Sequence, residues 1–221
     1  MKSKLAITLI LSLILSISCS FFKKQNSTDK GEVLELIERY EKSLDKNTRL
    51  KLEDIGNKNI KYPFCRALYI ASYDSYRFGM NKGSYDEPVS DKIKEEVINN
   101  REIFLRALNL RILEYALMIP ESQFELYEFP GSIWNVLELL SFIPDKSSLK
   151  SLAAFIYTSQ AVRKQSQAET LIQKIVDHDK TDFSYKAWWK KNKNVIFSIE
   201  ELANFDEIRK KRSKLLRDAE K

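Results

Sequence analysis

Apolar residues recur along this chain at the three- and four-residue spacing of amphipathic helices. At the start of the folded part, Val33, Ile37, Tyr40 and Leu44 share one face of a first helix. A short second helix follows and ends at Gly56. By the same periodicity we predict further helices at residues 63–78, 90–118, 132–142, 148–164, 167–178, 183–191 and 198–220.

Local signals mark several of these boundaries. Pro63 suits the first turn of a helix, and Ser198 with Glu201 has the spacing of a capping box. No long run alternates with period two, and the best strand candidate is the short segment 195–199, VIFSI. The pattern therefore predicts an all-α fold of about nine helices, packed as an irregular multi-helix bundle or as a short α-solenoid of stacked helix pairs.

The amino-terminal segment has a different pattern from the rest of the chain. Lys2 and Lys4 precede an apolar stretch over residues 5–17, and small residues then lead to Cys19. A helix needs about 20 apolar residues to cross the hydrocarbon of a bilayer, so this stretch is too short to span one. The arrangement is typical of a signal peptide, which we predict to comprise residues 1–18.

The residues before Cys19, Leu15-Ser16-Ile17-Ser18, resemble a lipobox, where bacterial lipoproteins are cut and acylated on cysteine. The leucine lies one position further from the cysteine than usual, which resembles the relaxed boxes of spirochaete lipoproteins. The resemblance implies a lipid on Cys19. The alternative is ordinary signal-peptidase cleavage, because Ser16 and Ser18 also satisfy its small-residue rule and would leave a free, unlipidated chain.

Three regions follow from this interpretation. Residues 1–18 are the signal peptide, residues 19–31 form a lipidated start and a flexible polar tether, and residues 32–221 form a single helical domain. Because Lys2 and Lys4 leave with the signal, the net charge falls from +6 to +4. With Cys19 lipidated, Cys65 has no partner for a disulfide within the chain, so the fold depends on its core.

A second resemblance concerns the carboxyl-terminal part. The segment 185–193, YKAWWKKNK, resembles the tryptophan-rich helix near the end of some bacterial HEAT-type helical-repeat proteins. It covers a small share of the chain and implies an α-solenoid scaffold that binds partners along its surface. It transfers no active-site residue.

Motifs for catalysis, cofactors and metals are missing from the sequence. The five glycines never form a phosphate-binding loop, and there is a single histidine, His178, between Asp177 and Asp179. We interpret His178 as a residue of a helix end and Cys65 as a small buried apolar residue. We therefore predict no catalytic residue, no metal ligand and no cofactor, although acids such as Glu95 and Glu96 from distant helices could still assemble into a carboxylate site.

Two surfaces are candidates for binding. Tyr69, Tyr73 and Tyr76 share one helical face and could line an aromatic groove, or could simply be half buried against a neighbouring helix. Residues 183–221 carry eleven basic and six acidic residues, and the densest basic cluster is a candidate surface for anionic ligands. That cluster consists of Arg209, Lys210, Lys211, Arg212 and Lys214. The alternative for it is an ordinary solvated helix.

These observations lead to a hypothesis with two alternatives. We expect an exported lipoprotein held on the cell-envelope membrane by its lipid, with a non-catalytic helical module that binds a protein or a polyanion rather than nucleic acid. Ser20 is not the aspartate that retains lipoproteins at the inner membrane of well-studied Gram-negative bacteria, so the resemblance favours the outer membrane over the inner membrane. The alternatives are an envelope enzyme with a carboxylate-based site and a HEAT-like scaffold for envelope assembly.

Overall fold

The computed structural model of the chain describes residues 30–73, 89–119, 130–159, 162–176 and 183–219. Regular structure in these ranges consists of ten α-helices and one 3₁₀ helix, with no strand. The predicted all-α fold is confirmed. Segment 195–199, the strand candidate, instead joins the last two helices.

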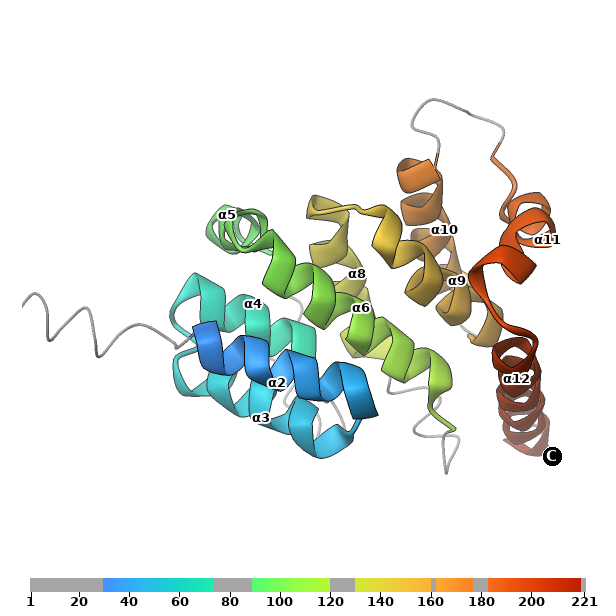
Figure 1. The fold of residues 1–221 in the computed structure, drawn as a ribbon, viewed down its shortest axis with the longest axis horizontal. Helices are drawn as coiled ribbons and strands as arrows, with labels where there is room; N and C mark the ends of the chain where they lie inside the picture. Colours follow the sequence, from blue (N-terminus) through green and yellow to red (C-terminus); the bar gives the residue numbers. More distant parts are fainter. Residues whose placement is uncertain (1–29, 74–88, 120–129, 160–161, 177–182, 220–221) are drawn as a thin grey trace, which may run out of the picture.

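The helices are numbered as in Figure 1. They are α2 (Lys30–Ser43), α3 (Lys46–Lys58), α4 (Pro63–Ser72), α5 (Asp91–Asn99), α6 (Arg101–Leu117), α8 (Pro130–Phe142), the 3₁₀ helix η1 (Lys146–Ser148), α9 (Leu149–Thr158), α10 (Val162–Val176), α11 (Tyr185–Ile196) and α12 (Ile199–Ala219).

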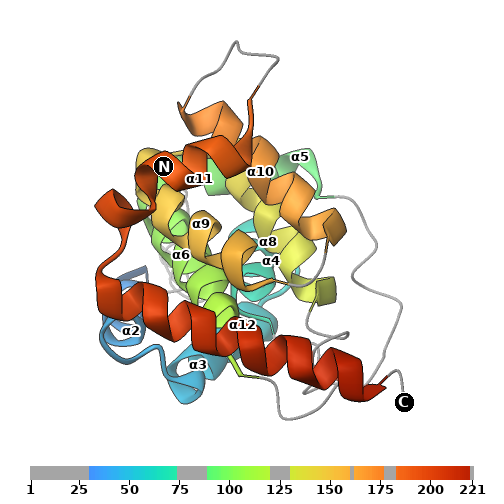
Figure 2. The same cartoon turned by 90° about the vertical axis from the view of Figure 1, so that its right-hand side faces the viewer.

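The helices form two rows that pack face to face (Figure 1). In one row α2 packs on α6, α6 on α9, and α9 on α12. In the other, α4 packs on α8 and α8 on α10, while α3 pairs with α4. Contacts of α6 with α4 and α8, and of α9 with α10, join the rows. Figure 2 shows α12 lying across the end of this arrangement, in front of α6 and α9.

A single apolar core fills the space between the rows. Every α-helix in the described ranges except α11 contributes buried apolar side chains to it, among them Phe104 of α6, Leu137 of α8 and Phe155 of α9. Val33, Ile37 and Tyr40 of the predicted first stripe are buried, and Leu44 lies just beyond the helix with a positive φ of 47°. Helical periodicity thus identified the buried face of α2 correctly.

Residues 90–118, predicted as one helix, are two helices that meet at Asn100. The Asn100 backbone has φ −116° and ψ 38°, outside the helical region. Its side-chain amide donates to the Glu96 carbonyl at 2.8 Å and to Glu96 Oε2 at 2.9 Å. An asparagine side chain that competes for backbone acceptors in this way ends α5, and α6 then begins at Arg101.

Gly56 does not end the second helix, as the sequence suggested, but lies inside α3 where α3 crosses α4. A Cβ atom on Gly56 would lie 2.6 Å from the Tyr69 backbone nitrogen and 2.8 Å from the Cys65 carbonyl oxygen. Real Cβ atoms essentially never approach backbone atoms so closely. The missing side chain therefore permits a close contact between two helix backbones.

Other helix boundaries differ by a few residues from the predicted ones. The third helix starts at Pro63 as predicted but ends at Ser72 instead of residue 78, α9 ends at Thr158, and α10 already begins at Val162. The predicted capping box at the start of α12 is confirmed. There the Ser198 backbone N–H donates to Glu201 Oε2 at 2.9 Å, and the Glu201 N–H donates to Ser198 Oγ at 3.2 Å.

Candidate functional site

Arg212 does not belong to the predicted basic surface. Its side chain is 1% exposed. Its guanidinium donates to the carbonyl oxygens of Thr158 at 2.9 Å, Tyr115 at 2.6 Å and Met118 at 2.7 Å, and it lies over the Tyr115 ring. The last carbonyls of a helix have no partner within the helix, and Arg212 supplies one to both α6 and α9. The residue is an interior cap, which corrects the prediction.

Helix dipoles balance the buried charge of Arg212. No carboxylate in the described ranges forms an ion pair with it, and burial lowers the pKa of the guanidinium, an effect that the Tyr115 phenol opposes. The carboxyl ends of α6 and α9 carry partial negative charge, which stabilises a cation placed there. Arg212 therefore links α12 to the bundle through the electrostatics of two helix ends.

The other four residues of the predicted basic surface are exposed. Lys211 pairs with Glu207 at 2.6 Å, and Arg209 lies 5.3 Å from the centre of the Tyr157 ring. Lys210 and Lys214 form no ion pair with a described carboxylate. Because α12 starts with acids and ends with bases, its charges also suit the helix dipole. These four residues alone do not distinguish a ligand surface from a solvated helix.

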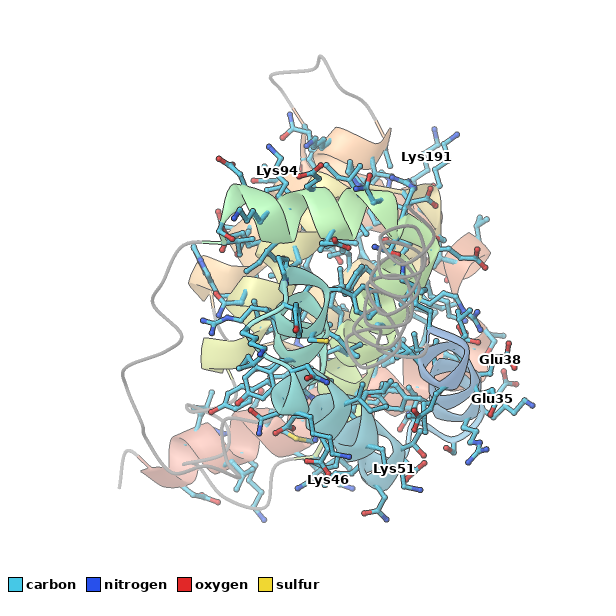
Figure 3. All side chains as sticks on the ribbon, turned by 90° about the vertical axis from the view of Figure 1, so that its left-hand side faces the viewer. Glu35, Glu38, Lys46, Lys51, Lys94 and Lys191 are labelled. Atoms are coloured by element: carbon cyan, nitrogen blue, oxygen red, sulfur yellow. The ribbon has the colours of Figure 1, made fainter. Side chains whose placement is uncertain are left out.

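A stronger concentration of positive charge lies on α11. This helix carries four lysines and no acidic residue, and Lys186, Lys190 and Lys191 are exposed. Figure 3 shows the Lys191 side chain projecting outward from the edge of the molecule. Charge on α11 is therefore of one sign and faces solvent.

Aromatic side chains attach α11 to α9. Trp189 stacks on Tyr157 of α9 with 4.8 Å between ring centroids, and the Tyr185 hydroxyl donates to the Ala153 carbonyl at 3.3 Å. No residue of α11 is fully buried, so the helix lies on the outside of the bundle. Trp188 and Trp189, quoted above for the HEAT-type resemblance, are both half buried.

The elbow between α11 and α12, which we define as residues 195–199, exposes two aliphatic side chains. Val195 is 84% exposed and Ile199 is 83% exposed. Between them Phe197 is buried and packs edge-on against Phe205 at 5.1 Å. Sequence reasoning missed this surface because it considered the apolar run only as a short strand candidate. The boundary between two helices within that run was the signal that could have revealed it.

A second charged cluster lies inside the molecule, at the carboxyl end of α4. The carboxylate of Glu114 accepts hydrogen bonds from Arg49 Nε at 3.0 Å, from Arg111 Nη1 at 2.7 Å and from the Tyr40 hydroxyl. The same arginines donate to the carbonyls of Ser72 at 2.7 Å and Tyr73 at 3.0 Å. The sequence signal for this interior cluster was the presence of charged residues on the buried face of α6.

This interior cluster has the chemistry of a helix cap. Burial acts to raise the pKa of Glu114, but the charges of Arg111 and Arg49 outweigh it and hold the pKa below its ordinary value. Burial, together with the charge of Glu114, raises the pKa of Tyr40. Glu114 is thus a carboxylate and Tyr40 a phenol at neutral pH, and both are engaged with their neighbours. The cluster holds α2, α3, α4 and α6 together.

The predicted tyrosine groove is not open in this structure. Tyr69 and Tyr73 are 6% and 7% exposed, and their ring centroids lie 5.1 Å apart. The third member, Tyr76, lies outside the described residues. Tyr69 and Tyr73 therefore pack in the interior, because α4 turns that face toward its neighbours.

The remaining candidates are placed as follows. Cys65 is buried in the core, whereas Cys19 and His178 lie outside the described residues. Within the described ranges, no three His, Cys, Asp or Glu side chains are grouped to hold a metal ion. None of the helices there is both long enough and apolar enough to cross a membrane.

Two shallow clefts also occur among the described residues. One, of about 460 Å³, is lined by Pro144, Asp145, Lys146, Lys174 and Ile175. The other, of about 400 Å³, lies between α2 and α3 and is lined by Glu32, Glu35, Leu36, Arg39, Lys51, Asp54, Ile55 and Lys58. In this second cleft three acids offset three bases, so it favours neither sign of ligand charge.

The chain matches no protein-family model, no curated protein and no solved structure.

Proposed function

We propose that this protein is an exported lipoprotein, held on the cell-envelope membrane through a lipid on Cys19, whose helical domain is a non-catalytic interaction module. The observation that carries the proposal is the lipobox-like run that precedes Cys19 after a short apolar segment. A polar tether from Cys19 to Asp29 would separate the lipid from the domain, because Lys30 and Gly31, assigned to the tether from the sequence, belong to α2.

The arrangement of charges supports binding over catalysis. The interior arginines serve helix ends: Arg49 and Arg111 cap α4, and Arg212 caps α6 and α9. Two carboxylates belong to the buried cluster: Glu53 pairs with Arg49 at 3.7 Å, and the charges of two arginines hold Glu114 ionised rather than poised to exchange a proton. Unbalanced charge lies on the outside, on α11, where it is available to a partner.

Metabolic labelling with a clickable palmitate analogue tests the lipid anchor. Wild-type protein is expected to carry the label and to stay with the membrane fraction, whereas Cys19→Ala is expected to lose the label and appear in the soluble fraction. Cys65→Ala is the matched control, because Cys65 is buried and should leave labelling unchanged. Equal labelling of wild type and Cys19→Ala would refute the anchor.

Protease treatment of intact cells then assigns the side of the outer membrane. Degradation in intact cells indicates surface display, and degradation only after permeabilisation indicates a periplasmic position. Recovery of the wild-type protein from the cytosol with residues 1–18 still attached would refute export altogether.

A further inference from the structure

The elbow between α11 and α12 holds two aliphatic side chains in water where a fold would ordinarily bury them. Val195 and Ile199 are each more than four-fifths exposed and lie four residues apart. Single exposed apolar residues are common, but these two flank the same elbow and together offer a candidate contact surface.

The exposure of this pair is built into the fold. Phe197, between the two, is buried and contacts Trp189 at 5.7 Å and Phe205 at 5.1 Å. Its backbone N–H donates to the Lys193 carbonyl at 2.9 Å. The capping box at Ser198 fixes the start of α12 directly afterwards. With Phe197 directed inward, the backbone presents Val195 and Ile199 to the outside.

Positive charge lies on the α11 side of the pair. Lys186, Lys190 and Lys191 lie on the exposed side of α11, and the helix has no acidic residue to offset them. The start of α12 carries two acids beside Ile199: Glu201 pairs with Lys150 at 2.7 Å, whereas Glu200 is exposed and its hydrogen bonds lower its pKa, so it stays negatively charged. Trp188 lies half buried three positions before Lys191 on the same helix.

We propose that the elbow and the outer side of α11 form a peripheral contact with an anionic phospholipid bilayer. Val195 and Ile199 enter the interfacial layer, while Lys186, Lys190 and Lys191 bind lipid phosphates. An apolar pair alone would suit a protein, and lysines alone would suit a soluble polyanion. Their combination matches a surface that is apolar beneath a layer of negative charge.

The inference rests on the proposed function only for delivery of the domain to a membrane. The lipid on Cys19 would keep the domain nearby, and the elbow would set which side of it faces the bilayer. The elbow's own affinity for lipid is measured without the lipid anchor.

A fluorophore at the elbow tests the contact in the full-length chain. Val195→Cys is prepared in a Cys19→Ser background and labelled with the environment-sensitive dye NBD, because buried Cys65 reacts poorly in the folded protein. Vesicles of phosphatidylcholine with phosphatidylglycerol are expected to shift the emission to the blue and raise it about threefold. The same dye at Lys51→Cys, on the exposed side of α3, should not respond.

Charge variants test the role of α11. Lys186→Gln, Lys190→Gln and Lys191→Gln together should weaken vesicle binding by about fivefold per lysine, and the loss should shrink in high salt. The control with equal net charge is Lys42→Gln, Lys51→Gln and Lys58→Gln, all exposed on α2 and α3. It should retain the full NBD response at residue 195.

Several outcomes would overturn the proposal. They are an unchanged NBD signal at residue 195 on anionic vesicles, equal responses at residues 195 and 51, or equal losses in the two triple variants. Stronger binding to heparin than to vesicles, with no blue shift, would identify a soluble polyanion as the ligand. Each result is independent of palmitate labelling, so failure at the elbow would leave the Cys19 anchor standing.

Discussion

The guanidinium of Arg212 donates a 2.7 Å hydrogen bond to the carbonyl of Met118, a residue 94 positions earlier in the chain. With the bonds to Tyr115 and Thr158, this contact fastens the last helix to the carboxyl ends of α6 and α9. The outer face of α12 is charged and resembles that of a solvated helix. A single interior cation, Arg212, nevertheless anchors this helix to the bundle.

Replacement of Arg212 by methionine is expected to destabilise the fold by about 3 kcal/mol, because buried helix-end carbonyls lose their donors. Urea unfolding followed by circular dichroism measures the loss. Lys210→Met, two positions away and exposed, should change the free energy of unfolding by less than about 0.5 kcal/mol. Similar effects of both substitutions would contradict the capping role of Arg212.

Glu114→Gln should be among the most damaging substitutions in the described part of the chain. It removes the carboxylate that pairs with both Arg49 and Arg111, at a cost of about 3 to 5 kcal/mol. Arg49 keeps a second, longer ion pair, with buried Glu53 at 3.7 Å. Glu41→Gln removes the partner of Arg106 at the surface and should cost less than about 1 kcal/mol. Comparison of the two unfolding midpoints tests the difference, and a tolerated Glu114→Gln would disprove the cluster's importance.

Acid should weaken the fold through the same carboxylate. The pKa of Glu114 is lowered in the folded state, since Arg111 and Arg49 overcome the opposing effect of burial. A lowered folded pKa stabilises the protein above the unfolded pKa, and this stabilisation disappears as the pH falls through the folded value. The stability gap between wild type and Glu114→Gln should therefore narrow from about pH 5 downward. Urea titrations at stepped pH measure it, and a constant gap would refute the assignment.

Gly56→Ala should force α3 and α4 apart. The added Cβ would meet the backbone of Tyr69 and Cys65, which cannot rotate away as a side chain can. We expect a loss of about 3 kcal/mol, despite the higher helix propensity of alanine. Asn57→Ala, at the next and exposed position, is the control and should be nearly neutral. Thermal unfolding of the two variants measures the difference in stability. An unchanged melting temperature for Gly56→Ala would exclude the close contact.

Features set by neighbouring residues could be predicted from the sequence. The helical class, the start of α4 at Pro63, the capping box of Ser198 with Glu201 and the buried face of α2 all depend on residues a few positions apart. Local spacing carries that information because a helix brings together residues three and four positions apart.

Features set by distant contacts could not be predicted. Helical spacing places Arg212 on the face of Phe205 and Ile208, but the sequence does not show which carbonyls it binds. Its neighbour Lys211 pairs with Glu207 at the surface. Gly56 looked like a helix end until α4 was placed against it, and the elbow looked like a strand. The sequence alone determined that the chain is helical and where most helices lie. Tertiary packing decided which charges cap helix ends and which apolar residues stay exposed, because those depend on partners tens of residues away.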